Sequence, residues 1–369
     1  MLNITKNTKN IYLGLMSGTS LDGIDIALCE IDGRGCKLLI YKESSLPKHL
    51  KNMILEIINH EITIAKVGEL DCLIAEEYAN AVNSFLKRYN INKEEIIAIG
   101  SHGQTLWHQP NAEIPFSMQL GNPSLLAVRT GIDVVADFRS KDVALGGQGA
   151  PFAPAFHKEM FSHIDRCAVV NIGGMANITV FSPTIIGYDS GCGNVLMDMW
   201  ISECKSIGYD KDGDWASSGE PNHVLLENML EDNYFKLNYP KSTGREYFNK
   251  SFLRKYLAPC DKISDRDIQA TLLALTVISI ANEIKRFDIG TLLVCGGGAK
   301  NLYLMKQLQE ALPLVDVAVT DKYSVGADEM EAMIFAWFAY KRLRSEKIVL
   351  KTVTGATKNT ILGGIYAAD

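Results

Sequence analysis

The first residues that could do chemistry form the run Ser17-Gly18-Thr19-Ser20-Leu21-Asp22-Gly23. This run lies between two apolar stretches rich in branched residues, an arrangement typical of a β-hairpin. Small residues at 18–20 let backbone N–H groups and hydroxyls face outward, which is the donor surface that a phosphate chain needs. The same residues suit a plain turn, in which Gly and Asp supply only backbone freedom. The hairpin alone leaves both interpretations open, and a plain turn is the commoner case.

A second polar run, Ser101 to Thr105, follows the apolar segment Ile96 to Gly100, which is predicted to be a short buried strand. Because α/β proteins place ligands at the carboxyl ends of such strands, this predicted loop is a site candidate. Its His102 and the nearby His108 are six residues apart, and no carboxylate or Cys completes a metal set. Polar contacts are therefore favoured over a metal ion.

A third run, Tyr188 to Asn194, precedes a segment with a helical pattern at 194–207. Asp189 is therefore expected just before a helix N-terminus. Asn194 and Asp198 lie one turn apart on the same face of that helix, so their side chains should be neighbours.

Glycines supply two other candidate ligand contacts. Gly173 and Gly174 form a turn between predicted strands at 166–170 and 178–181. Gly296, Gly297 and Gly298 follow a predicted buried strand at 291–295 and open a helix, a place where a ligand can lie close to the backbone.

The elements that must position these residues fall into two similar halves. In the first half, the two arms of the hairpin are followed by a strand at 36–43 and a helix at 47–59, the order that opens a ribonuclease-H-like sheet. A helix at 67–89, with one apolar face, is expected to lie across that sheet. The second half repeats this opening in weaker form at 168–181. The repetition predicts a duplicated α/β unit with a cleft between the copies.

Several further elements are predicted around these two openings. Asn122 and Pro123 suit the N-cap and first position of a helix that ends near Thr130, and a strand is expected at 133–138. Residues 265–287 are predicted to form a buried core helix because their apolar centre is too short and too closely flanked by charge to span a membrane. A last helix is expected at 328–344, with a Met and aromatic stripe facing the core.

The segment 208–250 is expected to be irregular and polar. Its residues 241–246 are expected to form a basic, flexible loop that could meet an anion, although a plain exposed charged loop is the commoner case. The DKDGD sequence of the segment, which begins at Asp210, is rejected as a calcium loop because the twelfth position is Pro221 and not Glu.

A domain boundary is expected near residue 140, where four charged residues precede a glycine-rich run. Those charged residues are Asp137, Arg139, Lys141 and Asp142. The first domain then comprises residues 1–140 together with about 346–369, and the second comprises residues 141–345.

Composition restricts the function classes. The chain has 369 residues, 47% of them hydrophobic and 22% charged, which predicts two domains with real cores. Its net charge of −6 argues against a nucleic-acid coat. The polar N-terminus is unlike a signal peptide, and the eight cysteines show no C-x-x-C pair, as expected of reduced cytoplasmic thiols. No Walker motif and no G-x-G-x-x-G occurs, which excludes those nucleotide folds.

The chain resembles a known family over about residues 11–366. Two sheets, each headed by a glycine-rich hairpin, resemble the sugar kinase, actin and heat-shock chaperone superfamily. More specifically, eight local sequence motifs are similar to those of anhydro-N-acetylmuramic acid kinases. These motifs are LGLMSGTSLDGIDIAL, IGSHGQTLWHQP, QLGNPSLLA, GIDVVADFRSKDVALGGQGAPFAPAFH, VNIGGMANITV, GYDSGCGNVLMD, KSTGREYF and LLVCGGGAKN. The resemblance implies two ribonuclease-H-like domains of the actin-like ATPase fold, with an ATP cleft between them.

The resemblance also implies site residues. Asp189 would be the catalytic base, and the ATP phosphate loop would consist of Gly18, Thr19, Ser20, Leu21, Asp22, Gly23, Ile24 and Asp25. Gly173 and Gly174 match the second phosphate loop of the superfamily, and Gly296, Gly297 and Gly298 match its adenosine loop. Arg139 and Asn194 are weaker sugar-binding candidates.

Three positions depart from the related patterns. Cys192 stands where the family usually has Pro, so the turn after Asp189 is expected to be looser. Leu15 and Asn171 stand where the wider superfamily often has an acidic residue near magnesium. Mg²⁺ is therefore expected to be held mainly by ATP and water, and no protein ligand is assigned to it.

The implied reaction takes 1,6-anhydro-N-acetylmuramic acid, ATP and water to N-acetylmuramic acid 6-phosphate and ADP, in the cytoplasm, during cell-wall recycling. O6 of this sugar bridges to C1 and carries no proton, so a base at Asp189 would activate water that attacks C1, as in an inverting glycosidase. Backbone N–H groups and Mg²⁺ would neutralise charge on the transferring phosphoryl group.

Other classes remain as alternatives. An actin-like or chaperone-like ATPase would turn over ATP without a sugar, and a glycosidase would hydrolyse the sugar without ATP. The expected partners are a small amino sugar and ATP, without nucleic acid or membrane. Exposed faces of the long helices could also support a homodimer.

Overall fold

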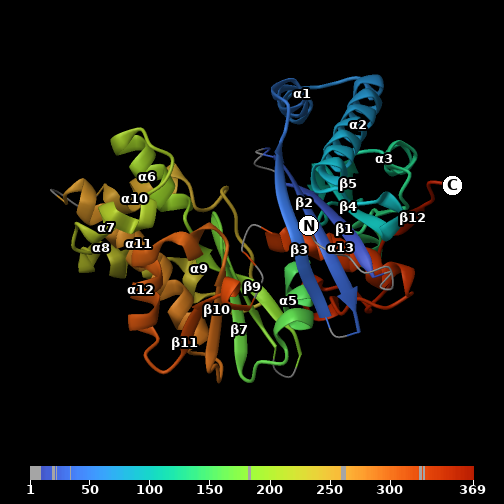
Figure 1. Ribbon diagram of the computed structural model, residues 1–369. Coiled ribbons are helices and arrows are strands. Elements are labelled where there is room, and N and C mark those ends of the chain that lie inside the picture. Colours follow the sequence, from blue (N-terminus) through green and yellow to red (C-terminus); the bar gives the residue numbers. More distant parts are fainter. Residues whose placement is uncertain are drawn as a thin grey trace. The chain divides into compact units, whose positions relative to one another are not determined.

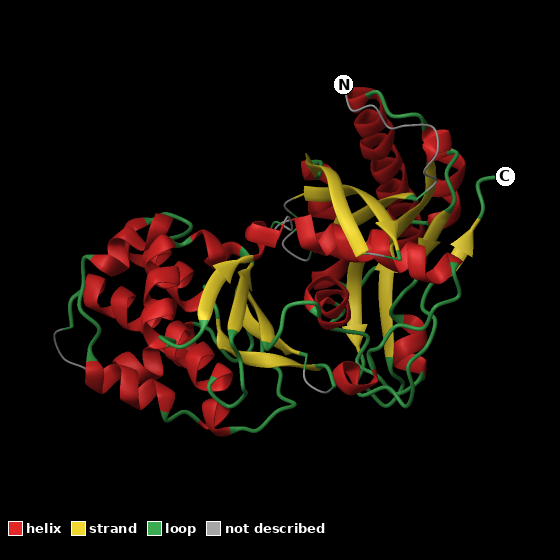
Figure 2. Cartoon of the chain, turned by 60° about the horizontal axis from the view of Figure 1, so that its bottom comes forward, coloured by secondary structure: helices red, strands yellow, loops and turns green. Residues whose placement is uncertain are grey.

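The computed structural model describes residues 10–369 except 19, 20, 22, 34, 182–183, 259–262, 324–325 and 327–328. It contains two compact units, Met1–Met160 with Glu329–Asp369, and Phe161–Asp328. Each unit is a mixed α/β structure with one sheet covered by helices (Figures 1 and 2).

The sheet of the first unit has the predicted ribonuclease-H-like order, β12-β6-β4-β1-β2-β3, with β5 paired to β4. Three antiparallel strands, β1 to β3, continue into the parallel strands β4 and β6. The strands are β1 (Ile11–Ser17), β2 (Gly23–Asp32), β3 (Gly35–Ser45), β4 (Ile96–Gln109), β5 (Phe116–Leu120), β6 (Val134–Ala136) and β12 (Gly364–Tyr366). Because β12 pairs with β6, the C-terminal segment returns to the first unit as predicted.

The helices of this unit include all of those expected before residue 131. The Asn122 side chain accepts a hydrogen bond from Leu125 N and Pro123 is the first helical residue, which confirms the predicted start of α3. The helices are α1 (Lys48–Asn59), α2 (Ile64–Tyr89), α3 (Pro123–Thr130), α4 (Ser140–Ala144), α5 (Ala153–Phe161), α13 (Glu329–Leu343), α14 (Lys351–Thr354) and the 3-10 turn η1 (Lys93–Glu95).

Helix α13 is the central helix of the first unit and packs on β1, β2 and β4. A Cβ atom at Gly14 of β1 would lie 1.8 Å from Ala332 O, and one at Gly100 of β4 would lie 1.8 Å from Phe335 O. Only glycine therefore allows the helix backbone to approach the sheet so closely. The Met and aromatic residues of the expected stripe are buried as predicted, but burial is not limited to one face, because residues 332–340 are all buried.

This packing also corrects the expected domain boundaries near residues 140 and 345. Helix α13 comes late in the sequence, yet its contacts place it in the first unit. Residues 141–160 belong to the same unit because Asp142 binds Thr354 Oγ1 (2.9 Å), and His157 Nε2 lies 3.0 Å from Met330 Sδ.

The sheet of the second unit has the order β11-β10-β7-β8-β9, which repeats the strand order of the first unit. This repetition confirms the predicted duplication. Its strands are β7 (Cys167–Ile172), β8 (Met175–Val180), β9 (Ile186–Cys192), β10 (Thr291–Cys295) and β11 (Asp316–Val319). Its helices are α6 (Val195–Lys205), α7 (Asp214–Ser217), α8 (His223–Leu230), α9 (Asn233–Lys236), α10 (Lys250–Leu257), α11 (Asp265–Ile284), α12 (Leu302–Ala311), η2 (Lys211–Gly213), η3 (Gly297–Lys300) and η4 (Thr320–Tyr323).

Helix α11 is the core helix of the second unit, as predicted. Its length and hydropathy would suit a membrane span, but 78% of its most apolar window is buried inside the unit. It packs on α6, α7, α8, α12 and β9.

Two segments differ from their expected structure. Residues 208–250 are not irregular, because short helices from η2 to the start of α10 occupy much of this stretch. Ser101 to Thr105 are not a loop but the middle of β4, which continues to Gln109 because it pairs with β5.

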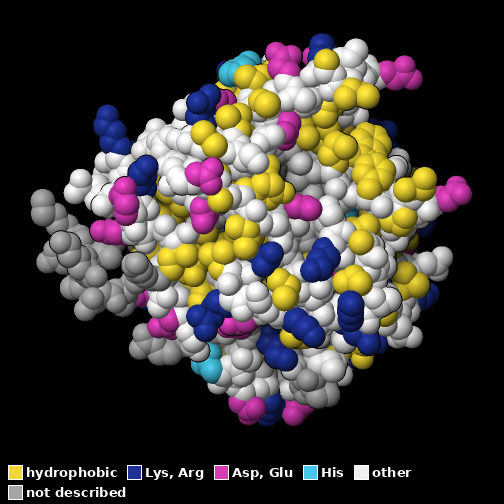
Figure 3. Space-filling model, turned by 90° about the vertical axis from the view of Figure 1, so that its right-hand side faces the viewer, with side chains coloured by type: hydrophobic (Ala, Val, Ile, Leu, Met, Phe, Trp, Pro, Cys, Tyr) yellow, Lys and Arg dark blue, Asp and Glu magenta, His cyan; other side chains and the backbone are white. Residues whose placement is uncertain are grey.

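The surface of the molecule is mixed in charge on the face that Figure 3 shows. Acidic and basic side chains both occur there, between hydrophobic ones. Large exposed apolar side chains are found along β4 and β5, where Trp107 is 42% and Met118 41% exposed.

Candidate active site

Asp189 lies within β9, opposite Asn177 of β8, and not in a loop directly before the helix. Three hydrogen bonds hold this residue. Its backbone N–H donates to Lys241 O (3.0 Å), and Tyr234 Oη donates to its carbonyl (2.8 Å). The backbone N–H of Thr243 donates to its carboxylate Oδ2 (2.9 Å). The loop at 241–246 therefore fixes both the main chain and the carboxylate of Asp189.

The half-buried environment makes Asp189 a base suited to neutral pH. Burial raises its pKa from 3.8 to about 6, the Thr243 N–H lowers it, and the nearby Glu246 carboxylate raises it. The side chain is therefore ionised at pH 7 yet basic enough to take a proton from water in a transition state.

The 241–246 loop is not the fully exposed charged loop expected from the sequence. The Lys241 side chain is only 2% exposed and forms an ion pair with Glu283 (2.7 Å) near the end of α11. Sequence reasoning missed Glu283. The signal was a single carboxylate at the end of a long apolar helix, a position where a buried charge needs a partner.

The two glycine runs of the second unit differ in what their neighbours require. Gly296 has φ +80°, and a Cβ atom there would lie 2.2 Å from Asn171 Oδ1 and 2.7 Å from Ile172 O. By contrast, a Cβ atom at Gly173 or Gly174 would have its nearest neighbour at 3.7 or 4.0 Å. The fold therefore requires glycine at 296, whereas at 173 and 174 the described protein leaves room for a ligand.

The turn at Gly173 and Gly174 adjoins the start of α6. Gly193 N donates to Gly174 O (2.9 Å) and Asn194 N donates to Gly173 O (2.8 Å). The Asn194 side chain donates to Ile172 O (3.2 Å). Asn194 therefore connects the second glycine turn to the helix that follows Asp189.

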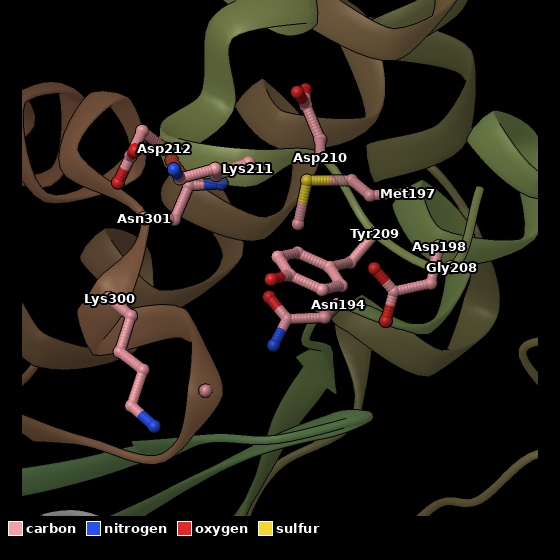
Figure 4. Close-up of a pocket in the computed structure, with 11 residues that line it drawn as sticks. Asn194, Met197, Asp198, Gly208, Tyr209, Asp210, Lys211, Asp212, Lys300 and Asn301 are labelled. Carbon is pink, nitrogen blue, oxygen red and sulfur yellow. The ribbon is translucent and has the colours of Figure 1, made fainter. Parts of the chain in front are cut away.

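A cavity of about 590 Å³ lies beside Asn194 and Gly297. Figure 4 shows that Asn194, Met197 and Asp198 reach it from the start of α6, and Lys300 and Asn301 from the segment after β10. Its remaining lining residues are Gly208, Tyr209, Asp210, Lys211, Asp212 and Gly297.

Asp198 is the second carboxylate of the site with a shifted pKa. Burial raises its pKa to about 6, Arg245 lowers it and Asp210 raises it. The predicted proximity of Asn194 and Asp198 is confirmed, because both side chains line this cavity.

The predicted hairpin, which is expected to bind phosphate, is present in the first unit as the antiparallel pair β1 and β2. Thr19, Ser20 and Asp22 lie outside the described residues. Ser17 Oγ donates to Gln104 Oε1 (2.8 Å), and Gln104 Nε2 donates to Gly18 O (3.3 Å), so β4 braces the start of the turn.

Not all hairpin residues can offer their side chains to a ligand. The side chains of Leu21 and Ile24 are 3% and 0% exposed, so these residues can offer only their backbone. Gly23 begins β2, and Asp25, two residues later, is half-buried and accepts a hydrogen bond from Tyr41 Oη (2.6 Å).

Arg139 is bound to its own unit. Its Nε and one terminal nitrogen lie 3.0 and 2.8 Å from His102 Nε2, and its other terminal nitrogen donates to Gly149 O (2.7 Å). Burial and the Arg139 charge lower the pKa of His102 to about 3, so the ring is neutral and can accept. Glu331 of α13, which sequence reasoning missed, interacts electrostatically with Arg139 and Asp25.

The described residues contain no group of three or more His, Cys, Asp or Glu side chains placed to hold a metal ion. Cys192, where the family usually has Pro, is fully buried, and burial raises the pKa of its thiol to about 12. The seven cysteines within the described ranges are not in disulfide bonds, and Cys260 lies outside those ranges.

Comparisons with known proteins place the chain in a family. The chain is 54% identical to an anhydro-N-acetylmuramic acid kinase of Sulfurovum sp. (97% of this chain, 99% of that protein). It is 51% identical to one of Sulfurimonas denitrificans (96% and 99%) and 46% identical to one of Shewanella denitrificans (97% and 98%). A looser likeness, at 10% identity and a TM-score of 0.45, links 90% of it to 96% of the 2-hydroxyisocaproyl-CoA dehydratase activator of Clostridium difficile. The family model for anhydro-N-acetylmuramic acid kinase matches residues 10–368, and the chain therefore belongs to this family of phosphotransferases.

Proposed function

We propose that this protein uses ATP and water to convert 1,6-anhydro-N-acetylmuramic acid to N-acetylmuramic acid 6-phosphate and ADP. The family membership supports a sugar kinase. The position of Asp189 supports the hydration step, because a half-buried carboxylate with a pKa of about 6 suits a general base.

The bond changes follow from the substrate. O6 bridges to C1, so an ordinary kinase base finds no hydroxyl proton to remove. Asp189 takes a proton from water as its oxygen bonds to C1, the C1–O6 bond breaks, and O6 bonds to the γ-phosphorus as ADP departs. Phosphorus thus replaces the acid of an inverting glycosidase, so one carboxylate suffices.

The nucleotide contacts in this proposal are mainly backbone groups. The hairpin from Gly18 to Asp25 and the turn at Gly173 and Gly174 would receive the phosphates. The 590 Å³ cavity beside Gly297 would receive the adenosine, supported by its size and its place after β10. Mg²⁺ would arrive bound to ATP and water, and no protein ligand is proposed for it.

The sugar contacts rest on two residues. Asn194 remains a proposed sugar contact because it lies at the junction of the glycine turn and α6. Arg139 remains one through its donors that His102 and Gly149 leave unused. Cell-wall recycling in the cytoplasm remains the proposed role of the reaction.

The single observation that carries this proposal is the environment of Asp189, and its test is isotopic. Turnover in ¹⁸O-water should place the label on C1 of the sugar and none on phosphate. Asp189→Asn keeps the size of the side chain but cannot accept the proton, so kcat should fall about 10²–10⁴-fold with ATP affinity little changed. For the wild type, kcat should fall about tenfold per pH unit below pH 6, because Asp189 becomes protonated there.

Asp288→Asn is a suitable control because that carboxylate is 83% exposed and pairs with the surface residue Arg166. Label in phosphate would indicate attack of water on phosphorus. ATP turnover that needs no sugar would favour the actin-like ATPase alternative. Near-normal kcat in Asp189→Asn would remove Asp189 from the mechanism.

A further inference from the structure

Helix α11 carries a row of polar residues under the strand that holds Asp189. Thr276 Oγ1 donates to Gly193 O (2.8 Å), and a Cβ atom at Gly191 would lie 3.5 Å from Ser279 Oγ. One turn further along the helix, Glu283 accepts a hydrogen bond from Tyr188 Oη (2.9 Å). Positions 276, 279 and 283 share one helix face, so this face follows β9 toward Asp189.

Glu283 is the most heavily bonded of these residues. Its Oε1 accepts from Lys241 Nζ (2.7 Å), and its Oε2 accepts from Tyr188 Oη and from Arg286 (2.8 Å). The side chains of Glu283 and Lys241 are only 7% and 2% exposed. A buried ion pair is costly to desolvate, and replacing such a pair with neutral residues often costs no stability. Stability alone therefore gives little reason for charges at this place.

We propose that the Glu283–Lys241 ion pair is a positioning device that holds the Asp189 carboxylate against the Thr243 N–H. Glu283 binds Tyr188, the residue before Asp189, and it also binds Lys241, whose carbonyl accepts the Asp189 N–H. Two residues after Lys241, Thr243 donates to the Asp189 carboxylate. One carboxylate on α11 thus joins the strand of the base to the loop that carries its hydrogen-bond donor.

The pair acts on Asp189 through this geometry. The influences on the pKa of Asp189 are burial, the Thr243 N–H and the charge of Glu246. Tyr234 of α9, whose Oη binds the Asp189 carbonyl, is held near Lys241, with Nζ 5.1 Å from its ring centroid. Further titratable groups facing this region are Cys192 on β9, Tyr247 just after the loop, and Tyr239, which stacks on Tyr188.

The test is the double variant Lys241→Met/Glu283→Gln, which removes both charges, keeps both side-chain lengths and changes no net charge. Without the pair, the loop is free to move the Thr243 N–H away from the carboxylate. A hydrogen bond to a charged group then no longer favours the ionised form, and the pKa of Asp189 should rise by about one unit. The acid limb of the kcat profile should move up by the same amount, with ATP affinity unchanged.

Carboxyl ¹³C NMR of the ligand-free protein gives the same pKa without turnover. This readout separates the present inference from the proposed function on which it rests. If Asp189→Asn abolishes turnover but the double variant leaves the pKa of Asp189 unchanged, only the positioning role of the ion pair is disproved. If Asp189→Asn turns over normally, the proposed function fails whatever the titration shows.

Lys341→Met is the matched control, because Lys341 is 15% exposed and paired with Glu346 (2.8 Å) in the first unit, whereas Asp189 belongs to the second. It should lower stability without moving the limb. The single variant Glu283→Gln should be less stable than the double variant, since it leaves the buried Lys241 charge without its carboxylate partner. Lys241→Met should cost less, because Glu283 keeps its bonds to Arg286 and Tyr188. A downward shift of the Asp189 pKa in the double variant would indicate that the pair acts directly through its charges. An unchanged acid limb of the kcat profile would indicate that the pair has only a structural role. Either result overturns the inference.

Discussion

Two buried histidines of the first unit, His102 and His157, are held in the neutral form. His102 is 5% exposed and His157 is 1% exposed, and burial lowers the pKa of each to about 3. His102 must stay neutral for its Nε2 to accept from Arg139, which assigns the ring proton to Nδ1. The contact between Arg139 and β4 therefore persists until pH falls to about 3, and only the unfolded chain takes up protons at these histidines above that pH.

The first unit should consequently lose stability in mild acid. The unfolded chain takes up a proton at each histidine as pH falls through about 6.5, whereas the folded unit takes none until about pH 3, so stability decreases over this window. Between pH 7.5 and 5.5 the two residues together should cost about 3 kcal/mol. Hydrogen exchange at β1 and β4 amides measures this loss. His157→Gln, which cannot titrate, should halve it, and equal exchange free energies at both pH values would contradict the prediction.

At the scale of elements, the two glycine turns of the second unit have different tasks. The turn at Gly296 passes so close to Asn171 and Ile172 that it must be glycine for the fold. The turn between β7 and β8 has no such crowding at Gly173 or Gly174. Substitution can therefore separate the structural glycine from the glycines proposed to bind a ligand.

Gly296→Ala should destabilise the second unit by about 1–3 kcal/mol, because its positive φ and the 2.7 Å approach to Ile172 O both oppose a side chain. Gly173→Ala should change stability by less than about 0.5 kcal/mol. It should nevertheless weaken ATP binding about 10–100-fold, because the added methyl group would keep a phosphate from approaching the turn, at a cost similar to that of one hydrogen bond to a charged group. Thermal unfolding and calorimetric titration with ATP measure the two effects. Wild-type ATP affinity in Gly173→Ala would assign that turn a structural role only.

At the scale of the whole molecule, the two units have sheets with the same strand order. In the sequence, the second unit is inserted between two segments of the first. The second unit has a core of its own, from Ala168 to Leu312. The first unit is completed only by α13, which comes after the second unit in the sequence. The two units should therefore differ in their ability to fold alone.

A fragment of residues 161–328 should unfold cooperatively, because its core is complete. A fragment of residues 1–160 should not, since removing α13 exposes the glycine-lined surface at Gly14 and Gly100. Joining residues 329–369 to it through a short flexible linker should restore cooperative folding, because His157 and Met330 already lie in contact. Urea unfolding followed by circular dichroism compares the three fragments. Cooperative folding of 1–160 alone would show that α13 is not integral to the unit.

Much of this architecture was readable from local sequence. Hydrophobic periodicity and turn residues predicted both hairpins, α2, α3 and α11, because these elements are set by neighbours within a few residues. The sequence also indicated that the two halves begin with the same order of elements. Through motifs similar to those of the family, it identified Asp189 and the glycine turns as candidate site residues. The expected cleft between the two domains stays a prediction.

Tertiary structure decided the features that depend on distant partners. The sequence did not reveal that α13 belongs to the first unit, because Gly14, Gly100 and Ala332 meet only in the fold. Ser101 to Thr105 became strand through pairing of β4 with β5, which local polarity concealed. The loop expected to be exposed at 241–246 is instead held by Glu283, some 40 residues away in the sequence, whose Oε1 lies 2.7 Å from Lys241 Nζ. The sequence alone identified Asp189 as a carboxylate of interest. Its basicity, by contrast, arises from burial and from hydrogen-bond donors that lie near it only in the folded chain.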